Sequence, residues 1–188
     1  MSKTKKLTTC AMLIAFAVVL TLLSKLIPSL PSGGSVTIAS MVPIIVISII
    51  FDVKWGLLSS FVFSLLQMMP VFGGFYPPPT QTFFNFFLVV MLDYIIAYGV
   101  LGLAGLFYKL FGKKLWAIPL SGLIVTGLRY VCHIMSGILI WGVYAENQTV
   151  FAYSLTYNGS YMIPEIIIST VTLAVISKFI LNQSKKFN

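Results

Sequence analysis

The chain has 188 residues, of which 59% are hydrophobic and 9% charged, with a formal net charge of +8. A mean hydropathy of +1.00 excludes an ordinary soluble domain, which carries far more charge. Several apolar runs reach the roughly 20 residues that span a bilayer, and no alternating barrel pattern occurs. The sequence therefore predicts an all-α integral membrane protein, with a single membrane-embedded domain over residues 1–188.

Six transmembrane helices are predicted along the chain, forming one bundle. They cover residues 7–27, 38–51, 55–70, 83–108, 115–142 and 161–181. The second and third are short and the fifth is long, so we expect tilt or uneven depth. The first is expected to be a span and not a cleaved signal peptide, because it is longer than a signal-peptide core and no small-residue cleavage site follows it.

Basic residues gather on one side of the predicted membrane. They are Lys3, Lys5, Lys6, Lys54, Lys109, Lys113, Lys114, Lys178, Lys185 and Lys186. The opposite loops, at about residues 28–37, 71–82 and 143–160, contain no Lys or Arg. The positive-inside bias therefore places both termini in the cytoplasm. This topology and attraction to anionic lipid account for the net charge, so no nucleic-acid site is predicted.

The three opposite loops are apolar and aromatic in character. The first contains Gly33-Gly34, the second joins Gly73-Gly74 to a run of three prolines, and the third carries several tyrosines. Glycine pairs permit unusual backbone angles, whereas a proline run is stiff and extended. The loops indicate either a lid over a pocket or an aromatic belt that anchors the chain at the membrane surface.

Asp93 is the only charged residue of segment Phe83–Phe107, and Arg129, which His133 follows, is the only one of segment Leu115–Gly142. A charge at the centre of a bilayer costs at least roughly 2.5–3.5 kcal/mol, so such residues usually face a bundle interior or an aqueous cavity. One interpretation is a polar ligand site. The alternative is a buried Asp93–Arg129 pair that joins the two spans, with His133 in an interhelical hydrogen bond.

Helical spacing places polar and aromatic side chains on common faces. These are Arg129, His133, Gly137 and Trp141 on the fifth span, and Asn85, Val89 and Asp93 with the adjacent Tyr94 on the fourth. If the two faces meet, the pocket contains a carboxylate, an imidazole, an indole and a glycine gap that a ring can approach. A carboxylate beside an indole suits a planar, cationic ligand.

Sequence motifs of enzymes are absent from the chain. There is no G-x-x-x-x-G-K-[ST] phosphate loop and no H-E-x-x-H metal motif. The 4 acids and 1 histidine are few for a metal site and too scattered for a two-carboxylate mechanism. Cys10 and Cys132 form no disulfide or metal pattern and are expected to be packing residues. We therefore predict no enzyme activity, no metal and no cofactor.

Four segments together resemble a known family. They are Leu92-Asp93-Tyr94, the R-x-x-x-H-x-x-S-G pattern of residues 129–137, the tryptophan segment 141–145, and the Y-S-L-x-Y-N pattern of residues 153–158. At these separations they resemble the thiamine-specific S components of energy-coupling-factor (ECF) vitamin transporters, the ThiT/YuaJ family. The resemblance extends from Gly33-Gly34 through the sixth span, with the same length and the same six-span layout.

The resemblance implies that thiamine binds near the outer face, beneath the loops. The implied substrate-binding residues are Asp93, Tyr94, His133, Gly137, Trp141, Tyr153 and Asn158. Gly137 is then the close-approach glycine and Trp141 the stacking tryptophan. The chain departs from the family's pattern in two ways. Asp93 replaces a glutamate, and two further tryptophans are missing, with Phe72 as a candidate substitute for one of them.

The resemblance also implies partners: a transmembrane coupling subunit and two cytoplasmic ATPase subunits, in a prokaryotic plasma membrane. Docking is expected on the first span at a small-x-x-x-small motif, which Ala11 and Ala15 fit. The expected function is the substrate-binding component of an ECF-type ABC transporter for high-affinity thiamine uptake. The alternatives are an S component for another vitamin or a thiamine precursor, a stand-alone carrier and a membrane enzyme.

Overall fold

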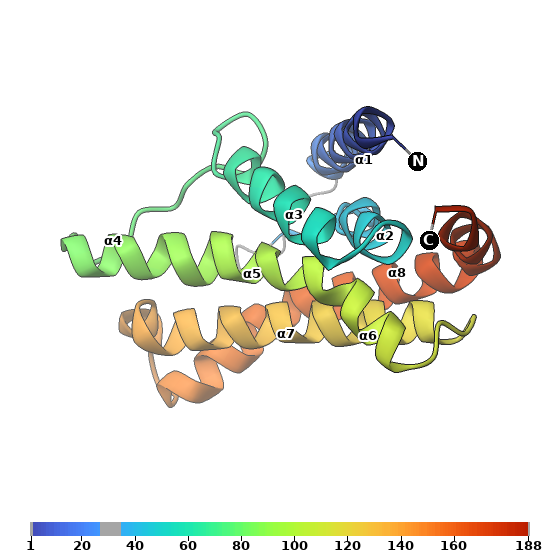
Figure 1. Cartoon of the computed structure of the whole chain (residues 1–188). Coiled ribbons are helices and arrows are strands. Elements are labelled where there is room, and N and C mark those ends of the chain that lie inside the picture. The colour runs from blue at the N-terminus through green and yellow to red at the C-terminus, as the bar shows by residue number, and fades with distance from the viewer. Residues whose placement is uncertain (1, 27–34, 188) are drawn as a thin grey trace.

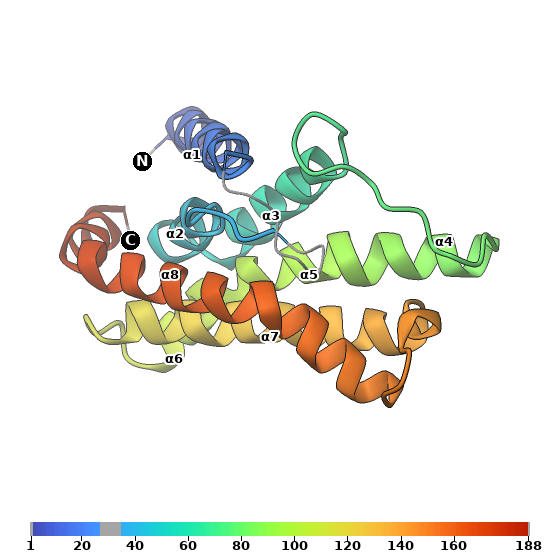
Figure 2. The same cartoon turned by 180° about the vertical axis from the view of Figure 1, so that it is seen from behind.

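The computed structural model describes residues 2–26 and 35–187, so the Gly33-Gly34 part of the first loop lies outside the described residues. All regular secondary structure in these ranges is helical (Figures 1 and 2). The elements are α1 (Lys3–Ser24), α2 (Val42–Ile50), α3 (Val53–Gln67), α4 (Phe83–Val89), η1 (Val90–Ile95), α5 (Ile96–Gly99), η2 (Val100–Leu103), α6 (Ala104–Leu110), α7 (Ala117–Leu139), η3 (Gly142–Tyr144) and α8 (Val150–Phe187).

Helices occupy each position where a span was predicted, but they differ in length. Four helical runs are long and apolar enough to cross a membrane: α1, the continuous run Phe83–Leu110, α7 and α8. The apolar helix α3 is shorter, with 15 residues. Helix α2 has only 9 residues, which is about 14 Å of helix and less than half the hydrocarbon thickness. The all-α membrane class agrees with the prediction, while the number of crossings stays a prediction.

Helix α2 forms the centre of the bundle, and every one of its residues is buried. The hydroxyl of Ser48 donates to the Gly102 carbonyl at 2.5 Å and accepts from the Gly105 amide at 2.8 Å. A Cβ added to Gly102 would lie 2.6 Å from the backbone nitrogen of Leu57 in α3. The glycines therefore allow α2, α3 and the end of the fourth span to meet at backbone contact, as small residues do between membrane helices.

The predicted fourth span is one continuous run of helix whose type changes along its length. Segment η1 is a π-helix, in which the Ile96 amide donates to the Met91 carbonyl five residues earlier. Segment η2, further along, is a 3₁₀-helix. A π turn is wider than an α turn and changes which residues share a face, and such turns are frequent at functional sites.

The loop predicted at residues 143–160 is helical from Val150 onward, so that part of the prediction is wrong. Thr149 explains where α8 begins, because its hydroxyl accepts from a backbone amide of the first turn at 3.2 Å, as an N-cap does. The polar residues Ser154 and Asn158 hydrogen-bond to backbone carbonyls of α7. These two polar side chains lower the hydropathy of the segment, which is why it was predicted as a loop. In the structure they contribute to the packing of α8 against α7.

Both chain termini lie at one end of the bundle. In Figure 1 they share that end with the turn between α6 and α7, and the view from behind in Figure 2 agrees. The α3–α4 loop and the connection from α7 to α8 lie at the other end. This arrangement is the one that the predicted topology requires, whereas the side of the membrane that each end faces stays a prediction.

Candidate functional site

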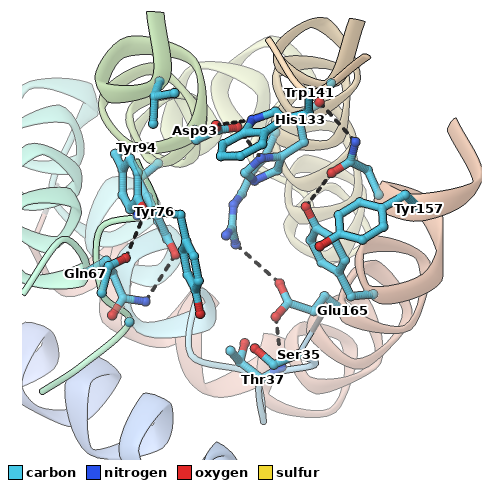
Figure 3. A pocket seen from close by; sticks show the side chains of 18 of the residues that line it. Ser35, Thr37, Gln67, Tyr76, Asp93, Tyr94, His133, Trp141, Tyr157 and Glu165 are labelled. Atoms are coloured by element: carbon cyan, nitrogen blue, oxygen red, sulfur yellow. Dashed lines mark hydrogen bonds and ion pairs between the residues drawn. The ribbon is translucent and has the colours of Figure 1, made fainter. Parts of the chain in front are cut away.

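A cavity of about 1000 Å³ lies among α1, α3, η1, α5, α7 and α8 (Figure 3). Its lining includes every predicted binding residue: Asp93, Tyr94, His133, Gly137, Trp141, Tyr153 and Asn158. Phe72, the candidate substitute for a missing tryptophan, also lines it. Asn85 is not part of the lining, and its side-chain amide instead donates to the Thr80 carbonyl at 3.0 Å. The two faces predicted from helical spacing therefore do meet, except at Asn85.

Asp93 is held by three side chains of α7 and its C-terminal extension. Its Oδ1 lies 3.2 Å from Nδ1 of His133. Its Oδ2 accepts from the Ser136 hydroxyl at 2.7 Å and from the Trp141 indole nitrogen at 3.2 Å. The Asp93 side chain keeps 17% of its surface exposed. The carboxylate is thus fixed in position by hydrogen bonds, and part of it still faces the open cavity.

The π turn of η1 determines which residues this helix presents to the cavity. Val89, Asp93, Tyr94 and Tyr98 all line it. Asp93 and Tyr98 are five residues apart, and in a regular α-helix such residues point about 140° away from each other. Hydrogen bonds that span five residues widen the turn and bring both side chains to the same side.

Tyr94 joins the cavity wall to the α3–α4 loop. Its hydroxyl donates to the Gly74 carbonyl at 2.8 Å and accepts from the Tyr76 amide at 3.2 Å. Gly74 has a φ of +94°, a backbone angle that glycine adopts without strain. Phe75 packs against the Tyr94 ring with centroids 5.8 Å apart. Because Gly74 and Tyr76 line the cavity, this glycine- and proline-rich loop forms part of its wall.

Two aromatic pairs form another part of the cavity wall. Trp141 and Tyr144 stack with ring centroids 6.4 Å apart and an interplanar angle of 20°. Tyr153 and Tyr157 stack at 5.6 Å and 24°. All four rings line the cavity. Flat π faces of this kind attract planar rings and cations.

Gly137 and Asn158 join α7 to α8 beside the cavity. The position of a Cβ on Gly137 is filled by Ser154, and the Asn158 amide nitrogen lies 3.1 Å from it. The Asn158 side chain donates to the His133 carbonyl at 3.1 Å and accepts from the Tyr161 hydroxyl at 2.6 Å. The glycine gap expected for a ligand ring is therefore occupied by α8, and both ends of the Asn158 amide already have partners.

Arg129 pairs with Glu165 of α8, which corrects the alternative of an Asp93–Arg129 pair. Arg129 Nη1 lies 3.3 Å from Glu165 Oε2, and the guanidinium lies 4.2 Å from the centroid of the Tyr98 ring. Glu165 Oε1 accepts from the Thr37 amide at 2.8 Å. The two charged residues are only 7% and 2% exposed. This buried pair therefore connects α7, α8 and the segment before α2.

Sequence reasoning missed several cavity residues, among them Glu165, Gln67 and Tyr98. Glu165 is an acid inside the apolar run of the sixth span, so the criterion that singled out Asp93 and Arg129 would have identified it as well. Gln67 is a neutral residue at the end of a short span, and no single-sequence signal marks it. Tyr98 reaches the cavity through the π turn, which hydropathy does not predict.

Ala11 and Ala15 lie on a different surface from the predicted binding residues. Both are exposed, and both line an apolar groove of about 590 Å³ between α1 and α3. Phe72 lines the groove as well as the cavity. The two alanines are not part of the cavity lining, which agrees with the expected separation of docking from binding. Their docking role stays a prediction.

The fold and the cavity define a class of protein. Long apolar helices surround a cavity that is lined by a fixed carboxylate, aromatic rings and hydrogen-bonding side chains. Concave sites with a few placed polar groups bind small molecules, and a carboxylate among rings suits a cationic one. The chain is therefore a membrane protein whose cavity has the features of a small-molecule-binding site.

Comparisons with known proteins give the family. The family described as Thiamine transporter protein (Thia_YuaJ) matches residues 7–185. The thiamine transporter ThiT of Bacillus subtilis is 35% identical over 176 residues, covering 88% of this chain and 86% of that protein. ThiT of Lacticaseibacillus paracasei is 31% identical over 96 residues, covering 46% of this chain and 48% of that protein.

A solved structure of ThiT from Listeria monocytogenes has the same fold. It aligns with a TM-score of 0.73 at 21% identity, covering 97% of this chain and 98% of that one. The chain belongs to the thiamine transporter family. This membership confirms the resemblance found in the sequence and points to a transporter role, not to an enzyme.

Proposed function

We propose that this chain is the substrate-binding (S) component of an ECF-type ABC transporter, and that it binds thiamine with high affinity for uptake through the cell membrane. The observation that carries the proposal is the fixed carboxylate of Asp93 beside the Trp141 ring, inside a cavity of a thiamine transporter family member. The proposed binding residues are Asp93, Tyr94, His133, Gly137, Trp141, Tyr153 and Asn158, all of which line that cavity.

The chemistry of thiamine fits this lining. Its thiazolium ring is permanently cationic, and Asp93 offsets that charge in a poorly solvated site, where charge interactions are stronger than in water. The rings of Trp141 and Tyr153 offer π faces to the thiazolium and the aminopyrimidine. Nε2 of His133 is buried and has no hydrogen-bond partner within residues 2–26 and 35–187, so it is available to a polar group of the ligand.

The proposed topology has six crossings, both termini in the cytoplasm and the cavity near the outer face. Lysine placement supports the orientation through the positive-inside bias. The common end of the bundle that holds both termini and the α6–α7 turn supports it too. The short helices α2 and α3 are expected to cross with help from bilayer thinning or from burial within the bundle.

The proposed partners are a transmembrane coupling subunit and two ATPase subunits. This sequence has no phosphate-binding loop of its own, so another protein has to supply ATP hydrolysis. Ala11 and Ala15 form the proposed docking surface, since small exposed residues allow another helix to approach closely. The cavity is lined by Thr21 and Ser24 near the C-terminal end of α1, whereas the groove is lined by residues 7–19 of this helix, so binding and docking can take place together.

Isothermal titration of the purified chain tests the proposed ligand. The panel consists of thiamine, its phosphate esters and its pyrimidine precursor. We expect thiamine to bind more tightly than the precursor, because the precursor lacks the thiazolium cation that Asp93 offsets. Tighter binding of the precursor or of an unrelated vitamin would contradict the proposal and favour an S component for another compound.

A further inference from the structure

The wall of the cavity formed by α1, α3 and α5 carries a polar group that the proposed contacts to thiamine leave unused. Gln67 lines the cavity and is 4% exposed. Its Oε1 atom has no hydrogen-bond partner in the part of the chain that the structure describes. A buried carbonyl oxygen without a donor is destabilising and rare in folded proteins, which calls for a ligand or water as its partner.

The orientation of the Gln67 amide follows from its neighbour on α1. The Thr21 hydroxyl donates its proton to the Ala17 carbonyl at 3.1 Å, so toward Gln67 it acts as an acceptor. It lies 3.5 Å from Nε2 of Gln67, and Nε2 also donates to the Tyr98 hydroxyl at 3.1 Å. These two contacts assign the nitrogen end of the amide. The free end that Gln67 presents is therefore its acceptor oxygen.

Tyr98 supplies a donor beside this acceptor. Its hydroxyl oxygen accepts from Gln67, and no acceptor for its own proton is present among the described residues. The Tyr98 ring is held in place, because the Arg129 guanidinium covers it and the Phe63 ring packs perpendicular to it, with ring centroids 5.3 Å apart. A free acceptor next to a free donor complements a hydroxyl group, which donates one hydrogen bond and accepts others.

We infer that Gln67 and Tyr98 form a hydroxyl-binding subsite that selects the free alcohol of the ligand. The inference rests on the proposed function, since thiamine carries a hydroxyethyl group on its thiazolium ring. The π turn brings Asp93 and Tyr98 to the same side of their helix. The thiazolium ring of thiamine can therefore contact the Asp93 carboxylate while its hydroxyethyl group reaches the subsite. Figure 3 shows Gln67 and Glu165 on opposite sides of the cavity, with the Tyr76 side chain drawn between them.

The subsite makes a prediction about specificity. A phosphate ester replaces the O–H donor with an anionic group, which the Gln67 oxygen repels. The charge of Arg129 offers such an anion little compensation, because Glu165 already pairs with it at 3.3 Å. The subsite itself therefore favours the free alcohol over an analogue that has no hydroxyl, and its acceptor oxygen disfavours a phosphate ester.

The test compares thiamine with a deoxy analogue in which an ethyl group replaces the hydroxyethyl group. The wild-type chain is expected to bind thiamine about 5- to 150-fold more tightly, the range expected when a buried polar group loses its partner. Gln67→Met has a similar length and no amide, so it should bring this ratio close to one, mainly by weakening thiamine. Tyr98→Phe removes the hydroxyl, which is both the donor to the ligand and the acceptor for Nε2 of Gln67, and should lower the ratio as well. Gln183→Met makes the same substitution outside the cavity lining and should preserve the ratio.

Each outcome separates this inference from the proposed function. Equal affinities of the wild-type chain for thiamine and the deoxy analogue would overturn the subsite and leave thiamine binding intact. An equal loss of affinity for both ligands in Gln67→Met would also overturn the subsite, because it would mean that Gln67 only maintains the shape of the cavity. Absence of thiamine binding to the wild-type chain would overturn the proposed function, and the subsite with it.

Discussion

At the scale of single residues, Asp93 combines two roles that a substitution can separate. Its carboxylate holds Ser136 and Trp141, and it offers a negative charge to a cationic ring. Asp93→Asn keeps the size and an acceptor but removes the charge. We expect thiamine binding to weaken by at least about 30-fold, or about 2 kcal/mol, because a desolvated cation loses its partner. Titration with thiamine and with a neutral pyrimidine analogue measures the loss of affinity for each ligand. The affinity for the analogue should change little.

The control for this prediction is Asp52→Asn. Asp52 caps α3 through hydrogen bonds to backbone amides, and asparagine caps a helix equally well. This variant should bind both ligands as the wild-type chain does. If Asp93→Asn weakened both ligands equally, Asp93 would be an anchor for α7 and not a partner of the cation.

Trp141 gives a second test at this scale. Trp141→Ala should cost roughly 1–3 kcal/mol of binding, which is about 5- to 150-fold in Kd, because a stacking and cation–π surface is lost. The chain has 3 tryptophans, and of these only Trp141 lines the described cavity. Thiamine should therefore quench tryptophan fluorescence in the wild-type chain and leave it unchanged in Trp141→Phe. A quench that persists in Trp141→Phe would remove Trp141 from the site.

At the scale of helices, the contact of α7 with α8 is expected to depend on Gly137. An added Cβ at this position meets Ser154, so Gly137→Ala should lower the free energy of unfolding by about 1–3 kcal/mol, as overpacking does. Gly127→Ala is the matched control in the same helix, because nothing lies within 4 Å of its added Cβ. That variant should be unchanged or slightly stabilised, since alanine favours helix. Thermal unfolding in detergent measures the stability of both variants. Equal effects of the two substitutions would contradict a role of Gly137 in packing α7 against α8.

The Arg129–Glu165 pair provides a second test of this contact. Glu165→Gln keeps an acceptor for the Thr37 amide but leaves Arg129 buried without a counter-charge. We expect a loss of stability of about 3–5 kcal/mol, the range for breaking a buried ion pair. Adding Arg129→Gln should recover part of that loss. If the two effects simply added in thermal unfolding, the two residues would not be coupled, and the pair would not join the helices.

Sequence patterns predicted the helices well where the apolar runs were long and uninterrupted. They failed at α8, because Ser154 and Asn158 are polar residues that bind the backbone of α7 instead of water. The cavity position of Asp93 could be predicted, since an isolated charge in an apolar run needs a polar environment. The positions of Gln67 and Tyr98 could not, because they depend on a π turn and on which helices meet.

At the scale of the whole molecule, binding and docking are expected to be separable. Replacing Ala11 or Ala15 with Trp should block the approach of a partner helix to the groove of α1 and α3. In cells that contain the complete transporter, thiamine uptake should then fall sharply. Thiamine binding to the isolated chain should stay near its original strength, because neither alanine lines the cavity.

Val175→Trp is the control for this prediction. Val175 lies on α8 and is 77% exposed, so the substitution adds the same bulk to another exposed surface. Uptake and binding should both persist. If Ala11→Trp and Ala15→Trp lost both binding and uptake, these positions of α1 would be needed for the packing of the cavity and not for docking. If uptake persisted in these variants, the docking surface would have to lie on another helix.

The central claim is that this chain binds thiamine by itself and depends on partners for transport. Its most direct test uses the purified chain in lipid vesicles with labelled thiamine, and it measures bound and accumulated vitamin in the same sample. The proposed function predicts saturable binding of one thiamine per chain, abolished by excess unlabelled thiamine, and no accumulation inside the vesicles. Accumulation beyond one molecule per chain would identify a stand-alone carrier, and the absence of binding would contradict a thiamine site in this cavity.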